Sequence, residues 1–117
     1  MFPIIKIPGN IFQGWKIMNY KALEPKIWKF PENIGYENVP GYLNILNNRR
    51  FMNELVIDLS GTKILHSSFI GFLIYAKQTI EKNNGRLEIV LSKKSEKIFH
   101  MLNIYTFFSR NITEKLP

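Results

Sequence analysis

The sequence predicts an α/β domain with a mostly parallel β-sheet. Three observations support this fold class: two compact apolar runs that suit buried strands, a helical apolar pattern after each run, and short connections between the segments. The runs are ELVIDLS at 54–60 and RLEIVL at 86–91. Strands that alternate with helices through short connections pair in parallel by crossovers, and the crossing helices bury such a sheet.

The first 25 residues allow two interpretations. The segments FPIIKI (2–7) and GWKIMNY (14–20) are β-branched or aromatic and lie between Pro, Gly and Asn residues, which is typical of strands. An interaction arm is the alternative. KIWKF (26–30) alternates in polarity and ends at Pro31, which predicts a short strand.

Residues 31–40 are rich in Pro, Asn and Gly, which predicts a loop. We expect a helix to begin at its end, with Asn38 as the cap and Pro40 in the first turn, where a missing N–H costs nothing. Apolar residues then recur at three- and four-residue steps, as they do on one buried helical face. They are Val39, Tyr42, Leu43 and Leu46.

The segment after the 54–60 strand predicts a long helix. Ser60–Thr62 resembles a turn, and KILHS (63–67) is expected to extend the crossing under the sheet. Ser67 or Ser68 is expected to be the N-cap. Apolar residues recur at helical spacing up to Ile80, and the helix is expected to end at Asn84-Gly85, with Gly85 in the left-handed conformation.

The C-terminal part predicts one further helix. Ser92 is expected to cap it, and Asn103 to end it in the left-handed conformation. Ile98, Phe99 and Leu102 would share its apolar face. Residues 109–117 predict a loosely packed tail, and residues 1–117 together have the length of a single domain.

Composition narrows the functional classes. The 117 residues include no cysteine, which excludes disulfides, zinc thiolates and cysteine nucleophiles. No apolar stretch approaches the roughly 18 residues of a membrane span, and the start lacks the pattern of a signal peptide. We therefore expect a cytoplasmic protein. The net charge of +7 is compatible with a nucleic-acid partner. However, the basic residues are scattered and carry no recognition motif, so no direct binding to nucleic acid is expected.

The sequence gives little support for catalysis. His66 and His100 share no metal-ligand spacing, so neither a metal site nor a cofactor is expected. His66 and Ser68 resemble part of a nucleophilic site, but residues so close in a turn rarely align imidazole and hydroxyl, and no orienting acid is near. The protein is not expected to be an enzyme.

Two adjacent serines at a helix start permit a regulatory function. The structural interpretation is that one of them is simply the N-cap, worth about 1 kcal/mol. The functional interpretation is that Ser68 accepts phosphate, because the positive end of the helix dipole tolerates the added negative charge. At a partner-facing surface this charge would oppose binding while the domain stayed folded.

The order of these segments resembles the STAS domain family of anti-sigma-factor antagonists. The resemblance is closest from Glu54 to Phe108, in DLSG (58–61), HSSFIG (66–71), NGRLEIV (84–90) and MLNIYTFF (101–108), and is looser upstream. It implies a small STAS-like domain with a mixed, mostly parallel sheet and helices largely on one face. Its core would be residues 26–108.

The resemblance also implies a function. Ser68 lies at the position of the family's phosphorylated serine or threonine, and Gly71 matches a glycine to which we assign close helix packing. The partner would be a kinase-type anti-sigma factor or a similar switch protein. Partner-binding residues would be His66, Ser67, Ser68, Phe69 and Phe72.

Two departures from the family pattern lie in the loop itself. His66 replaces an acidic residue that would help to position the hydroxyl, and Phe69 replaces a glycine. Phe69 is therefore open to two interpretations, as a core residue or as an interface anchor. His66 is expected to be a hydrogen-bonded turn residue, and a pH-dependent partner contact is the alternative.

Two rival functions stay open. One is a constitutive, non-phosphorylated STAS subunit of a transporter or stress-signalling assembly, with Phe69 as its anchor. The other is nucleic-acid binding through the basic surface, which predicts a strong salt dependence. The sequence also leaves open the partner's identity, the signal and the oligomeric state, a dimer included.

Overall fold

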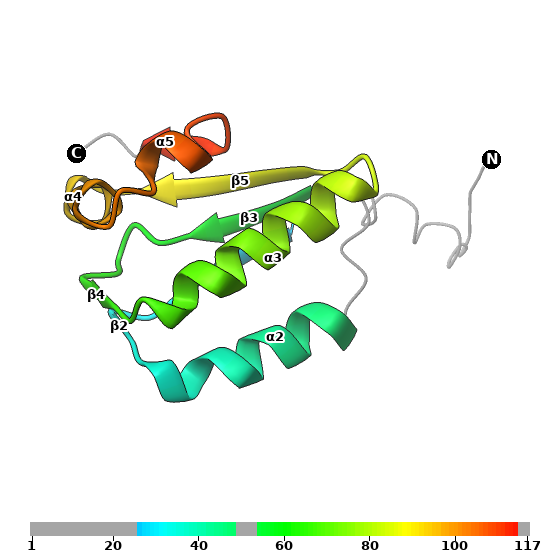
Figure 1. The fold of residues 1–117 in the computed structure, drawn as a ribbon, viewed down its shortest axis with the longest axis horizontal. Coiled ribbons are helices and arrows are strands. Elements are labelled where there is room, and N and C mark those ends of the chain that lie inside the picture. The colour runs from blue at the N-terminus through cyan, green and yellow to red at the C-terminus, as the bar shows by residue number, and fades with distance from the viewer. Residues whose placement is uncertain (1–25, 49–53, 115–117) are drawn as a thin grey trace, which may run out of the picture.

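The computed structural model describes residues 26–48 and 54–114, so the predictions for residues 1–25 lie outside the described residues. A four-stranded sheet of order β1-β3-β5-β6 forms one layer of the fold, and Figure 1 labels its two central strands, β3 and β5. The strands are β1 (Lys26–Lys29), β3 (Glu54–Asp58), β5 (Arg86–Leu91) and β6 (Ile112–Glu114). Every ladder among the described residues is parallel.

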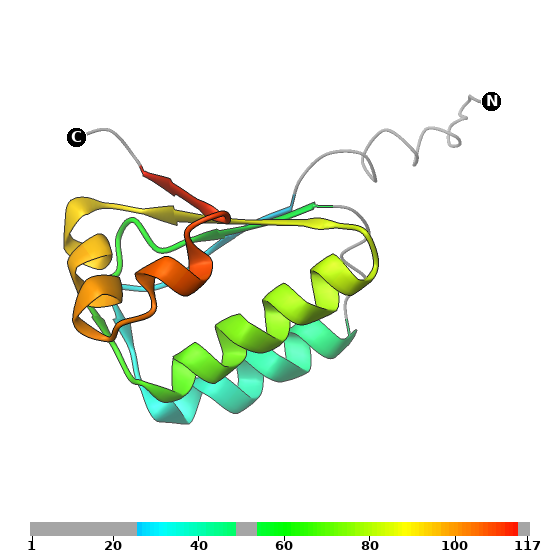
Figure 2. The ribbon, with the colours of Figure 1, turned by 45° about the horizontal axis from the view of Figure 1, so that its top comes forward.

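The helices lie on one side of this sheet (Figure 2). They are α2 (Val39–Asn48), α3 (Ser68–Lys82), α4 (Lys93–Met101) and α5 (Tyr105–Phe108), with a 3₁₀ turn, η1 (Tyr36–Asn38), before α2. Alternate residues of β3 and β5, such as Leu55 and Leu87, are buried under them, because side chains along a strand point to opposite faces. The predicted α/β class, mostly parallel sheet and one-sided helices are confirmed.

The predicted helical stripe of α2 is confirmed. Val39 and Leu46 are buried, and Tyr42 and Leu43 pack against the core. Asn38, however, does not cap α2: its side chain accepts the backbone N–H of Gly35 at 3.0 Å. It therefore closes the 3₁₀ turn that precedes the helix.

Two short strands that the sequence did not predict lie beyond the ends of β1 and β3. β2 (Asn33–Ile34) pairs in parallel with β4 (Ile64–Leu65). The predicted loop at 31–40 is thus partly wrong, and KILHS does not extend under the main sheet but forms half of this small second sheet. Each strand has only two residues, too few to show an alternating pattern.

Two predictions about chain ends are also corrected. Asn84, with φ 63°, takes the left-handed conformation after α3, whereas Gly85 has no positive φ. Residues 112–114 of the predicted tail form β6, which pairs with β5 from Ile89 to Leu91. Asn103, with φ 59°, ends α4 in the left-handed conformation as predicted. Among the described residues no helix has the length and apolar character needed to cross a bilayer.

Candidate functional site

The candidate site is the serine loop, which we define as residues 66–68. It connects β4 to α3 and is fixed by hydrogen bonds to the segment around β2. The His66 N–H donates to the carbonyl oxygen of Ile34 at 2.8 Å, and the N–H groups of Lys63 and Ile64 donate to that of Glu32 at 2.8 and 3.1 Å. The loop is therefore positioned by backbone bonds and does not depend on its own side chains.

Two further contacts support the approach to this loop. The hydroxyl of Thr62, a fully buried residue, donates to the carbonyl oxygen of Pro31 at 2.8 Å. The Lys63 ammonium and the Glu32 carboxylate lie 2.9 Å apart, and this bond holds the pKa of Glu32 below its ordinary value. Both contacts join the two segments that follow β1 and β3.

Neither serine caps α3 with its hydroxyl. Ser67 stands at the N-cap position, but its backbone is helical (φ −59°, ψ −24°) and its side chain makes no capping bond. The cap comes instead from His66, whose Nδ1 accepts the backbone N–H of Ser68 at 3.1 Å. By contrast, Ser92 caps α4 as predicted, because its hydroxyl accepts the N–H of Ser95 at 3.3 Å.

The His66 imidazole also contacts the Ser68 hydroxyl. Nδ1 lies 2.9 Å from Ser68 Oγ. Because a backbone N–H can only donate, Nδ1 carries no proton, and the hydroxyl donates to the same nitrogen. The expectation that a turn would keep these two groups apart is therefore wrong.

Nδ1 of His66 could accept the hydroxyl proton if Ser68 attacked an electrophile. Among the described residues no side chain hydrogen-bonds Nε2 of His66, so the third member of a catalytic triad is missing from this part of the chain. A proton on Nδ1 would remove the acceptor of the Ser68 N–H, whereas the contact with the hydroxyl could persist with the ring as donor.

The predicted partner-binding residues fall into two groups. His66, Ser67 and Ser68 are all exposed at the start of α3. Phe69 is fully buried and Phe72 is 1% exposed, so their prediction as direct contacts is wrong.

Phe69 belongs to an aromatic cluster in the core. Its ring stacks on Phe72 at 5.1 Å between centroids and meets Phe30 edge-on at 5.1 Å. Tyr42 lies 6.0 Å from it. The bulky residue that departs from the family pattern therefore fills the space between α2, α3 and the sheet, and the core interpretation of Phe69 is the correct one.

The structure adds two exposed residues that the sequence prediction missed. The Tyr36 ring lies 5.6 Å from the His66 ring and is 67% exposed. Ile64, two residues before His66, is 60% exposed. Because the carboxyl ends of neighbouring parallel strands meet at one edge of a sheet, the segments after β1 and β3 had to lie together, and this rule could have found Tyr36.

Gly71 does not serve close helix packing, contrary to the prediction. It is exposed on α3, and a Cβ built on it would meet nothing within 4 Å. Residues three apart on a helix share a face. Because Gly71 has no side chain, the helix backbone is uncovered one turn after Ser68, on the same face. We call Tyr36, Ile64, His66, Ser68 and Gly71 the serine patch.

The second histidine, His100, lies in a different contact from the serine loop. His100 stacks on Tyr105 at 4.2 Å and lies 3.6 Å from Glu96, far along the sequence from the serine loop. Within residues 26–48 and 54–114, no group of three or more His, Cys, Asp or Glu side chains is placed to hold a metal ion.

Comparison with known proteins does not assign a family: no protein-family model, no curated protein and no solved structure matches the chain. The STAS resemblance therefore rests on the sequence motifs alone.

Proposed function

We propose that this protein is a regulatory protein-binding domain that resembles an anti-sigma-factor antagonist and is controlled by phosphorylation of Ser68. Its partner would be a kinase-type anti-sigma factor or a similar switch protein, and the serine patch would be the contact surface. A cytoplasmic location is part of the proposal, because the phosphoryl donor would be ATP.

One observation carries this proposal: the Ser68 hydroxyl is exposed and has no capping role. Ser68 is the first residue of α3, and His66 already binds its backbone N–H. A phosphate on Oγ would replace the hydroxyl proton without removing a hydrogen bond that the helix needs. It would also lie near the positive end of a 15-residue helix, where negative charge is favourable.

The surroundings of Ser68 support a change in partner binding on phosphorylation. Tyr36 and Ile64 give the serine patch exposed apolar area, and Gly71 lets a partner approach the helix backbone. A phosphate adds close to two negative charges. A partner that buried this patch would have to desolvate those charges, so the modified protein should be released while its fold persists.

The test is to incubate the purified protein with a serine kinase-type partner from the same host and with ATP, and to map the modified residue by mass spectrometry. We expect one phosphate on Ser68 and none in Ser68→Ala. Ser67→Ala is the matched control and should still be modified. Labelling that persists in Ser68→Ala would reject Ser68 as the site.

The same proteins separate this proposal from constitutive binding. Complex formation lost in Ser68→Asp but kept in Ser68→Ala supports the switch. The alternative, a constitutive STAS subunit, predicts no phosphate and equal binding by both variants. Its anchor would have to be Tyr36 or Ile64, because Phe69 is buried.

A further inference from the structure

A polar cleft lies at the end of α3 away from the serine loop. It is formed by the last turns of α3, the start of β5 and the segment that leads into β6, and its volume is about 360 Å³. Ser68 and Glu81 are about 20 Å apart along α3 at the rise of an α-helix. The cleft is thus a separate site, with a size in the lower part of the range for small-molecule pockets.

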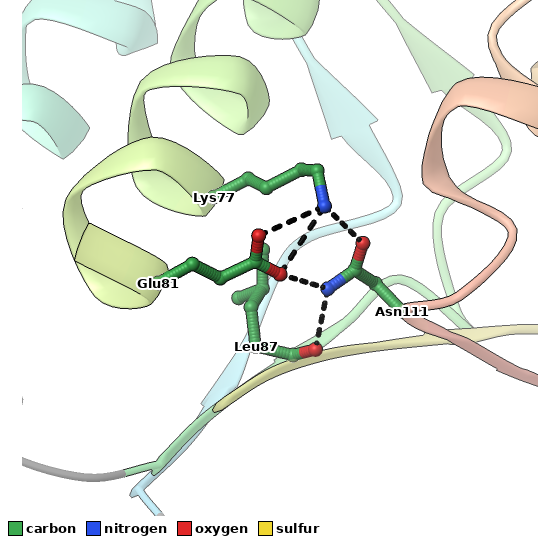
Figure 3. Close-up of polar contacts among 4 residues, drawn as sticks. All are labelled: Lys77, Glu81, Leu87 and Asn111. Carbon is green, nitrogen blue, oxygen red and sulfur yellow. Dashed lines mark hydrogen bonds and ion pairs between the residues drawn. The ribbon is translucent and has the colours of Figure 1, made fainter. Parts of the chain in front are cut away.

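The floor of the cleft is a closed hydrogen-bond network (Figure 3). The Asn111 amide donates to Glu81 Oε2 and to the Leu87 carbonyl oxygen, each at 2.9 Å. Lys77 Nζ donates to Asn111 Oδ1 and to Glu81 Oε1, each at 3.0 Å. Asn111 is only 6% exposed and its amide bonds to all three partners, so its side chain is held in place. Lys77 and Glu81 neutralise each other.

The remaining charges of the lining are not balanced. Arg86 comes from the start of β5 and Arg110 from the segment before β6, and Glu88 is the acidic residue that lines the cleft with them. Among the described residues neither arginine side chain forms a hydrogen bond or an ion pair within 4.0 Å. Two guanidinium groups from distant parts of the sequence thus line one concave surface.

We propose that this cleft binds a small molecule through a phosphate group. A guanidinium presents parallel N–H donors that match a phosphate, and two of them would balance its charge. The excess positive charge of the lining favours a phosphate over a neutral ligand. The fixed network below would hold Arg110 beside Asn111 and limit the ordering that binding requires.

The probe is inorganic phosphate, titrated into the full-length protein and followed by NMR, with chloride at matched ionic strength as the reference. We expect saturable shifts at the backbone amides of residues 85–88 and 110–113 and at the arginine side chains. Arg110→Gln and Arg86→Gln should each weaken phosphate binding by on the order of tenfold, since each removes a charge-assisted contact.

Lys97→Gln is the matched control because it removes the same charge from an exposed position on α4. Its phosphate affinity should equal that of the wild type. The proposal is overturned if phosphate gives no saturable shifts beyond those of chloride, or if Lys97→Gln weakens binding as much as the arginine variants. In those cases the cleft provides only general positive charge.

Discussion

The backbone N–H of His66 donates to the carbonyl oxygen of Ile34 at 2.8 Å. Ile34 is completely buried, so this bond ties the serine loop to the core. The segments after β1 and β3 thereby act as one support for residues 66–68. Side-chain changes in the loop should alter its chemistry more than its position.

The cap on α3 should depend on His66 and not on Ser67. His66→Ala removes the acceptor of the Ser68 N–H and should cost about 1 kcal/mol of unfolding free energy. His66→Asn should retain most of the stability, because a side-chain oxygen can accept the same bond. Urea unfolding measures both variants. Ser67→Ala, the control, should stay within about 0.5 kcal/mol of wild type, and equal losses in the two alanine variants would contradict the assignment.

Substitutions of Phe69 and Tyr36 should have different effects: the first should reduce stability and the second should reduce partner binding. Phe69→Ala leaves a cavity in the aromatic cluster and should cost about 3–5 kcal/mol, measured by thermal or urea unfolding. Tyr36→Ala should change stability little, because the ring is exposed, but should weaken the partner complex. The idea fails if Tyr36→Ala unfolds the domain as Phe69→Ala does, or if partner affinity is unchanged.

Gly71 should be replaceable at a gain in stability. A Cβ at this position meets nothing within 4 Å, and alanine is favoured over glycine in an exposed helix by about 0.5–1 kcal/mol. Gly71→Ala should therefore raise the unfolding midpoint, and under the proposed function it should reduce partner affinity. A variant that binds as tightly as wild type would show that the partner does not approach this turn.

The Asn111 network should be costly to break. Asn111→Ala leaves the buried Leu87 carbonyl without its side-chain donor and should lose about 1–3 kcal/mol. Asn44→Ala is the control: its side chain bonds only to Asn48 on the exposed face of α2, so its loss should be below about 0.5 kcal/mol. Urea unfolding of the two variants decides the matter, and similar losses would count against a structural role for the network.

Glu81 should make stability depend on pH in the acid range. The bond from Asn111, with the bond and charge of Lys77 and the charge of Arg110, holds the pKa of Glu81 below its ordinary value of 4.5, although burial opposes this. A carboxyl with a lowered pKa stabilises the fold fully above its unfolded pKa, and this contribution is lost as the pH falls through the folded value. The side chain is 41% exposed, so solvent screens the effect.

The check is unfolding free energy measured from neutral pH downward. Below the ordinary value, wild type should lose more stability than Glu81→Gln, which has no carboxyl to titrate. Glu37→Gln, at an exposed position, should follow the wild-type curve. Identical acid losses in wild type and Glu81→Gln would show that the network does not depend on the ionised carboxylate.

The central strands and long helices could be predicted because their patterns are local. Residues 54–58 and 86–91 are short apolar runs, and α3 repeats its apolar residues over four turns, so neighbouring residues decide these elements. The pairs that sequence reasoning missed are non-local. β2 and β4 have two residues each and depend on bonds between distant segments, from Thr62 to Pro31 and from His66 to Ile34.

The candidate site was predicted in position but not in chemistry. Exposure of Ser68 followed from the strand-to-helix order. Capping by His66 did not, because statistics favour serine at the N-cap and an imidazole acceptor depends on the loop geometry. The burial of Phe69 likewise depends on Phe30 and Tyr42, which come from distant segments.

A ring at position 66 that fastens the first turn of α3 leaves both neighbouring hydroxyls dispensable for folding. Among homologues, substitutions at position 66 should then be limited to side chains with an acceptor atom. Positions 67 and 68 should accept many residue types. If serine is nevertheless retained at position 68, its retention would indicate selection for the reactivity of the hydroxyl and not for a structural role.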